Sequence, residues 1–226
     1  MQGTTPAGKS RRGAARALAL RVLLPSSALI GATWALRRWS LHFGAVDDEA
    51  TTALPGDVLI LHPSLQSTRA ITIAADPHGI WPWVVQLGQS RGGFYSYSLL
   101  ENLFGADIHN ADEIVSEWQH LAVGDEIQLA PGMALGVVQV DPDHALVLRG
   151  GVPAGGAASP FEFTWAFVIR ETVSGTSRLV VRERYGYTRR WAALMVEPTE
   201  MVSFLMSQRM LRGIRDRAER SPERTS

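Results

Sequence analysis

The chain contains no cysteine, which excludes disulfide bonds, thiolate metal sites and cysteine nucleophiles. It also has no excess of charge, because 22 Lys and Arg residues balance 22 Asp and Glu residues. A chain without net charge gives no support for nucleic-acid binding, which needs a basic surface. We interpret the basic residues gathered in 9–21 and 209–224 as solvated tails and expect no nucleic-acid partner.

Several catalytic and cofactor motifs are missing as well. No Gly-Lys-Ser/Thr follows the glycines of 88–93, no dinucleotide fingerprint follows a strand, and no Gly-x-Ser-x-Gly occurs. The six histidines form no His-x-x-x-His pair. A site built from His109, His120 and the acids of 107–113 is the one combination available, and acids near histidine are common. We therefore expect neither a metal nor a cofactor.

What the chain does have is enough apolar sequence for one domain with extensions, since 46% of its 226 residues are hydrophobic. We divide it into a leader (1–43), an approach segment (44–65), a domain (66–220) and a tail (221–226). The sequence does not indicate the oligomeric state.

Residues 17–36 of the leader form an apolar stretch that is interrupted by Arg21 and Pro25 and closed by Arg37 and Arg38. The stretch is long enough to cross a bilayer. Three interpretations stay open: a transmembrane or interfacial anchor, an amphipathic helix packed on the domain, or a cleaved signal. The chain is thus expected to be membrane-associated through 17–36 or cytoplasmic. If the segment spans, the basic residues up to Arg21 place the N-terminus in the cytosol.

Within the domain, apolar alternation and turn residues predict strands followed by a long helix. Asp76 and Pro77 are typical of a helix start, so a helix should run from there to Leu87. Glu197 and Pro198 predict the start of a helix that ends near Arg220. The other expected elements are helices at 97–104 and 111–118 and strands at 67–74, 126–129, 135–140, 145–149, 161–170 and 178–185. A sheet with alternating faces must bury one of them, and the last helix is the obvious cover. We predict an α+β fold.

Four blocks of sequence resemble the START-like (SRPBCC, or helix-grip) superfamily, which includes polyketide cyclases. They are GQSRGGFYSYSLLENLFG at 88–105, HNADEIVSEWQHLAVGD at 109–125, FEFTWAFVIRE at 161–171 and RLVVRERY at 178–185. The resemblance covers about residues 66–220. The four blocks are similar to one bacterial subgroup, whose members often carry an apolar N-terminal stretch. It implies a curved antiparallel sheet wrapped on the long C-terminal helix, with an internal cavity for apolar or amphipathic ligands. It implies no reaction.

Glu183 is the candidate with the sharpest chemistry. On strand 178–185 it shares a face with Leu179, Val181 and Tyr185, so a carboxylate stands on an apolar face and could exchange a proton with a ligand. The alternatives are that it pairs with a nearby arginine or that a bulge turns it outward.

The glycine-rich loop and the late strands supply the expected ligand contacts. Tyrosine hydroxyls on the loop could orient a carbonyl, and a loop arginine could hold a carboxylate or phosphate. The alternative is that the loop aromatics plug the core. The expected ligand-binding residues are Arg91, Phe94, Tyr95, Tyr97, Trp165, Phe167, Tyr185, Met206 and Met210.

Three functions follow as hypotheses. The first is binding of a hydrophobic or amphipathic small molecule (lipid-, quinone- or polyketide-like) in the internal cavity. The second is a cyclase- or dehydrase-type enzyme that uses Glu183 as acid or base. The third is a regulatory or interaction protein whose cavity is collapsed and whose basic helix end, 209–220, contacts a partner.

Overall fold

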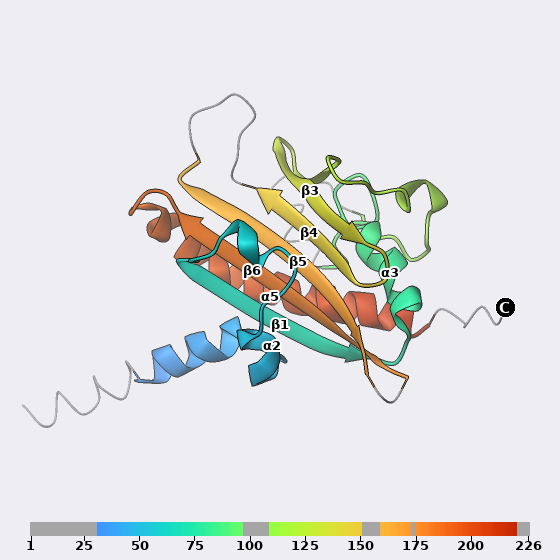
Figure 1. Ribbon diagram of the computed structural model, residues 1–226, viewed down its shortest axis with the longest axis horizontal. Helices are drawn as coiled ribbons and strands as arrows, with labels where there is room; N and C mark the ends of the chain where they lie inside the picture. The colour runs from blue at the N-terminus through green and yellow to red at the C-terminus, as the bar shows by residue number, and fades with distance from the viewer. Residues whose placement is uncertain (1–30, 97–108, 151–158, 173–174, 221–226) are drawn as a thin grey trace, which may run out of the picture. The chain divides into compact units, whose positions relative to one another are not determined.

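The computed structural model describes residues 31–96, 109–150, 159–172 and 175–220 (Figure 1). The chain divides into two units, residues 1–40 and residues 41–226, and the described part of the first is helical. No helix in these ranges is long and apolar enough to cross a bilayer. Most of the predicted apolar segment, residues 17–30, lies outside the described residues, as does the helix expected at 97–104.

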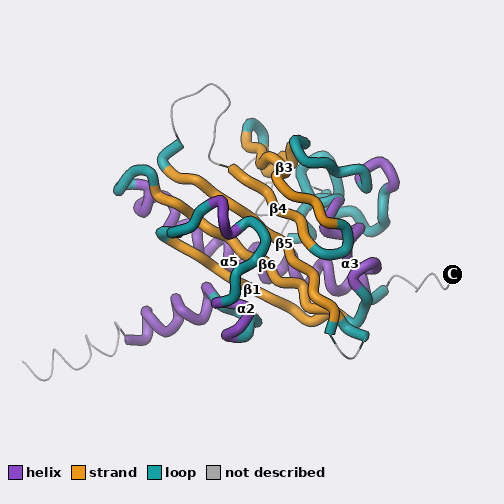
Figure 2. The backbone as a smooth tube through the Cα atoms, viewed as in Figure 1, coloured by secondary structure: helices purple, strands orange, loops and turns teal. Residues whose placement is uncertain are grey.

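The second unit is an antiparallel sheet covered by one long helix. The sheet has six strands in the order β1-β6-β5-β4-β3-β2, and each of its five neighbouring pairs is antiparallel. Figure 2 shows the strands as one continuous layer. The elements are α2 (Asp47–Thr51), η1 (Asp57–Leu59), β1 (Leu65–Ile73), α3 (Pro77–Val85), η2 (Ser116–Trp118), β2 (Glu126–Ala130), β3 (Met133–Asp141), β4 (Ala145–Gly150), β5 (Phe161–Glu171), β6 (Ser177–Tyr187) and α5 (Ala192–Ala218).

All six predicted strands are present, and the α+β class is confirmed. The helix predicted at Asp76 is confirmed too, since the Asp76 carboxylate accepts a hydrogen bond from the Gly79 N–H at 2.7 Å. Of the helical turn expected at 111–118, only the short 3-10 turn η2 forms.

Helix α5 begins five residues before the predicted start, at Ala192, and continues through Pro198. Proline removes a backbone donor, which is why the sequence indicated a helix start there. Next to Pro198, the Thr199 hydroxyl donates to the carbonyl oxygen of Val196 at 2.8 Å. A side-chain hydrogen bond thus supports the turn around Pro198.

The two faces of the sheet have different partners. The inner face carries Phe163, Trp165, Phe167 and Ile169 of β5 and packs on α3 and α5 (Figure 1). The outer face carries the arginines of β6 and is covered by residues 44–60. Arg182, only 2% exposed, uses all its N–H groups there. Its five acceptors are the Asp57 carboxylate, the Thr68 hydroxyl and the backbone carbonyls of Glu49, Ala50 and Thr52.

The apolar core lies between the inner face, α3 and the second half of α5. Ile80 and Val84 of α3 and Ile214 of α5 are fully buried in it. Gly213 permits a close approach, because a Cβ atom at this position would lie 2.5 Å from the backbone oxygen of Tyr95. This half of α5 is therefore fixed by close apolar packing.

Candidate functional site

Glu183 is buried on the inner face, 4% exposed, as the strand alternation predicted. Its carboxylate accepts hydrogen bonds from the hydroxyls of Ser203 at 2.9 Å and Ser207 at 3.2 Å, both on α5. The Ser67 hydroxyl and the Arg69 guanidinium, on β1, each lie 3.4 Å from it. Glu183 therefore joins three elements, and the arginine partner that the sequence left as an alternative is present.

Arg69 is the centre of this buried polar cluster. Its side chain is 1% exposed, and it makes its shortest contact, 2.6 Å, with Glu200 of α5. It also donates to Ser207 at 3.3 Å and lies over the ring of Phe204, 5.5 Å from the ring centre. We call Arg69, Glu183 and Glu200, with Ser67, Ser203 and Ser207, the carboxylate cluster. It places two carboxylates and one guanidinium under the first half of α5.

An aromatic wall adjoins the carboxylate cluster on the inner face. We give this name to Phe163, Trp165 and Phe167 of β5, Tyr185 of β6, and Phe94 of the loop that follows α3. The ring centres of Phe163 and Tyr185 are 4.7 Å apart, those of Trp165 and Phe167 4.8 Å, and those of Phe94 and Trp165 6.1 Å. In the sheet register Trp165 stands directly opposite Glu183. The wall thus continues from the carboxylate cluster toward β4.

Burial changes along this wall. Phe167 is fully buried, whereas Phe163, Trp165 and Tyr185 are only half-buried. Met206 of α5 is half-buried as well, while Met210, one turn later, is 2% exposed. Phe167 and Met210 therefore lie inside the closed core, whereas Trp165 and Met206 keep part of their surface accessible to solvent.

The wall carries two polar groups, the Trp165 indole N–H and the Tyr185 hydroxyl. The indole N–H of Trp165 is buried without an acceptor in the described parts of the chain. Burial, followed by the negative charge of Glu183, raises the pKa of the Tyr185 hydroxyl well above the usual value. Tyr185 therefore stays protonated at neutral pH and, like Trp165, can donate to a ligand.

Arg91 and Tyr95, expected near a cavity mouth, are held by other contacts. Arg91 donates to the backbone oxygens of Trp118 at 2.6 Å and Val85 at 3.1 Å. Tyr95 is 1% exposed and accepts a hydrogen bond from the Gln86 amide at 2.9 Å. Tyr95 thus packs in the core, the alternative given for the loop aromatics, and Arg91 ties its loop to two backbone oxygens. Tyr97 lies outside the described residues.

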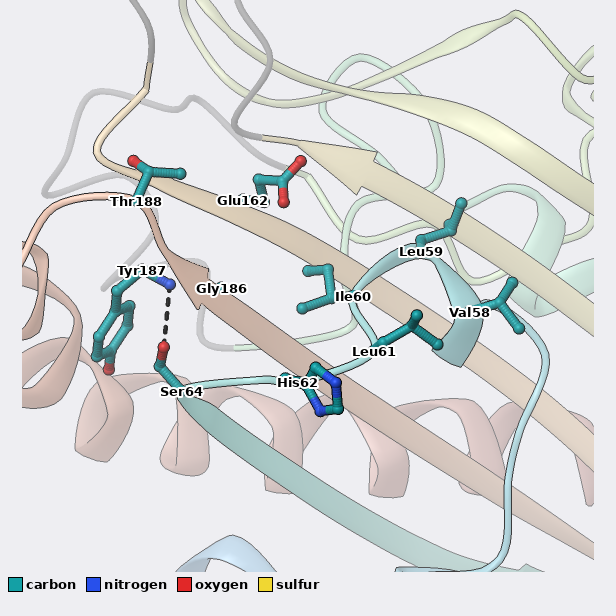
Figure 3. A pocket seen from close by; sticks show the side chains of 10 residues that line it. All are labelled: Val58, Leu59, Ile60, Leu61, His62, Ser64, Glu162, Gly186, Tyr187 and Thr188. Atoms are coloured by element: carbon teal, nitrogen blue, oxygen red, sulfur yellow. Dashed lines mark hydrogen bonds between the residues drawn. The ribbon is translucent and has the colours of Figure 1, made fainter.

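The structure also shows an open depression of about 370 Å³ on the outer side of the sheet (Figure 3). Glu162 and Gly186, paired on β5 and β6, contribute to its floor. Exposed side chains of the segment after η1, among them Leu61 and His62, form its rim. None of the expected ligand-binding residues lines it. In the described ranges no group of His, Cys, Asp and Glu residues could hold a metal ion.

Comparison with known proteins finds likenesses to solved structures. No family model matches the chain, and no curated protein matches it. Protein MLL2253 from Mesorhizobium loti is 16% identical with a TM-score of 0.41, over 70% of this chain and 98% of that chain. CalU16 from Micromonospora echinospora is 12% identical with a TM-score of 0.33, over 68% and 83% of the two chains. DynU16, a protein of the dynemicin biosynthetic locus, is 13% identical with a TM-score of 0.37, over 66% and 47%.

Likenesses at this level carry no argument about ligand or reaction. The fold rests on the chain itself, whose six-stranded antiparallel sheet and long C-terminal helix have the arrangement of the helix-grip fold. Two members of the site, Arg69 and Glu200, were not predicted from the sequence. Arg69 lies on β1 and Glu200 lies on α5. Their signal was present in the sequence, because Arg69 shares a strand face with Ile71 and Ile73, and Glu200, Ser203 and Ser207 lie three and four residues apart.

Proposed function

We propose that this protein binds an amphipathic small molecule between the inner face of the sheet and the first half of α5. The apolar body of the ligand would lie on the aromatic wall, and its polar end would point toward the carboxylate cluster. The observation that carries the proposal is the half-buried wall itself, which has a buried indole donor at Trp165 without an acceptor in the described chain. A ligand acceptor at Trp165 would remove the cost of that unpaired donor.

The residue types of the wall favour an apolar ligand that carries an oxygen acceptor. The rings offer flat apolar surface, while Trp165 and Tyr185 offer donors. A free carboxylate or phosphate on the ligand would be repelled by Glu183 and Glu200 unless Arg69 left its short contact with Glu200. Ligands with carbonyl or hydroxyl groups, such as quinone-, polyketide- or sterol-like compounds, therefore suit the site better than fatty acids do.

The test is to purify the full chain, record native and denaturing mass spectra, and analyse an organic extract of the same sample. We expect a bound compound that leaves on denaturation, or uptake of a carbonyl-bearing apolar compound from a panel. Met206→Trp should fill the site and lower binding at least tenfold. Met201→Trp is the matched control, because Met201 is 43% exposed on the far side of the helix, and it should bind as the unchanged chain does. Equal binding by both variants would contradict this location.

Catalysis by Glu183 is the second candidate. It is favoured by one observation: Glu183 is buried directly opposite Trp165 and beside Tyr185 on the same strand face. Glu183→Gln keeps the shape and the hydrogen bonds from the serines but removes the ionisable group. Loss of turnover with retained binding of the identified compound would assign a proton-transfer role. Unchanged turnover, or the absence of any turnover, leaves Glu183 as a structural residue.

The interaction hypothesis has less support from the basic helix end. Arg217 is bound within the domain, to Asp112 at 2.7 Å and over the ring of Tyr95 at 4.7 Å. Arg215 pairs with Asp216. Arg209, Arg212 and Arg220 are exposed, and Arg209 and Arg212 lie on the side of α5 that carries exposed apolar residues in its first half.

A further inference from the structure

Large apolar side chains are exposed along one side of the first half of α5. They begin at Trp191, which is 54% exposed, include Leu194 at 79%, and end at Leu205 at 48%. Their spacing of three or four residues keeps them on one side of the helix. We call the set the apolar stripe; it consists of Trp191, Leu194, Met195, Pro198, Met201, Val202 and Leu205. Contiguous exposed apolar surface of this kind marks an interaction site.

The charges around the apolar stripe all have one sign. Arg189 and Arg190 precede it, and Arg209 and Arg212 continue it along the same side of the helix. No exposed residue between positions 188 and 212 is acidic. Of the two acids of this stretch, Glu197 is half-buried and accepts a hydrogen bond from Tyr187, and Glu200 is buried and pairs with Arg69. The exposed side of α5 is therefore apolar in the middle and cationic at both ends.

We propose that the apolar stripe and its four arginines form a docking surface for an anionic lipid bilayer. The combination of an apolar helix side, flanking arginines and a tryptophan at the border is what an interfacial helix needs. Arginines within a Debye length of anionic headgroups are attracted to them, while the apolar side chains enter the boundary between headgroups and acyl chains. The helix lies along the membrane surface and does not span it. This proposal stands independently of the proposed ligand.

Charge argues against two other occupants of the stripe. A second copy of the chain would bring its own four arginines against these four, whichever way the two helices ran. The N-terminal residues of the same chain fit no better, because the first acidic residue is Asp47 and every charged residue before it is Lys or Arg. The basic N-terminal residues have the same sign of charge as the four arginines, so an anionic surface suits both.

The first experiment measures partition of the full chain onto vesicles of phosphatidylcholine, with and without phosphatidylglycerol. We expect binding that needs the anionic lipid and weakens with salt. Leu194→Glu with Val202→Glu should lower the partition about tenfold or more, because the carboxylates resist insertion and are repelled. Val58→Glu with Leu61→Glu is the control of equal charge at exposed apolar residues elsewhere. Equal loss in both variants would overturn the proposal.

A second experiment separates the stripe from the basic N-terminal residues. Since the chain has no cysteine, Leu194→Cys and Val58→Cys each accept a single environment-sensitive fluorophore. The label at position 194 should shift to the blue with anionic vesicles, and the label at position 58 should not. Vesicle binding without a shift at position 194 would show attachment through other residues and would overturn the proposal. A shift at position 194 that depends on protein concentration without vesicles would indicate self-association and would overturn it too.

Discussion

Replacing Arg69 with methionine tests whether the carboxylate cluster depends on one guanidinium. The side chains of Arg69, Glu183 and Glu200 are at most 5% exposed. Without Arg69, two carboxylates would remain in this interior without their shared cation. Removing one partner of a buried ion pair costs about 3–5 kcal/mol of unfolding free energy. The unfolding free energy of a chain of this size falls by about 2–3 kcal/mol per molar urea. The urea midpoint of Arg69→Met should therefore be lower by about 1–2 M.

The assay is urea unfolding of the full chain followed by far-ultraviolet circular dichroism. Arg149→Met is the control, because the Arg149–Glu162 pair has the same kind of contact, 2.7 Å, with side chains 35% and 37% exposed. An exposed pair contributes at most about 1 kcal/mol, so its midpoint should fall by less than about 0.5 M. If both variants shifted the midpoint equally, the buried carboxylates would not depend on Arg69.

The same reasoning predicts a reversal of sign. In the unchanged chain, Glu183→Gln removes a favourable charge and should destabilise. In the Arg69→Met background it removes an uncompensated charge, so the double variant should be more stable than Arg69→Met alone. A double variant that is less stable than either single variant would refute this account of the cluster.

Three further predictions concern other parts of the domain. Gly213→Ala should lower the unfolding free energy by about 2–4 kcal/mol despite the better helix propensity of alanine, because the new Cβ meets the Tyr95 backbone at 2.5 Å; urea unfolding measures it. Arg182→Lys should cost about 2–4 kcal/mol, since three donors cannot serve five acceptors, and limited proteolysis should then cut residues 44–60 faster. Burial raises the pKa of Tyr95 in the folded state, so the stability that Tyr95 contributes should be fully present below about pH 10 and be lost above it; Tyr95→Phe should reduce the fall above about pH 10 in a pH series of unfolding curves.

The strands could be predicted because their faces alternate, and the same alternation placed Glu183 inside. The contacts of Glu183 could not, because Ser203 and Ser207 come from a helix whose rotation depends on how it packs. Arg69 had the parity of an inner residue, but a lone arginine on a strand is normally exposed. Its burial depends on Glu200, 131 positions away, and no local pattern connects the two. Likewise, the loop residue Tyr95 can pack closely against α5 only because residue 213 of that helix is a glycine.

The early start of α5 has a similar cause. Local preference favoured a start at Pro198, but the helix gains apolar contacts by extending backward, since Ala192 and Val196 are buried. Packing outweighs the lost hydrogen bond, which shows that helix ends are set by tertiary contacts as much as by local signals.

The two halves of α5 are held by different forces, and this predicts how the interior opens. From Met210 onward the helix packs Leu211, Gly213 and Ile214 into the core. The first half buries Ala192, Val196 and Phe204 outside that core, rests also on the hydroxyls and charges of the carboxylate cluster, and contains Pro198. Polar contacts can be exchanged for water at small net cost, and buried apolar contacts cannot. In hydrogen exchange, the amides of 195–206 should therefore exchange at least tenfold faster than those of 210–218. Uniform protection along α5 would mean that the helix opens only as a whole, and a ligand beneath its first half would then require another route.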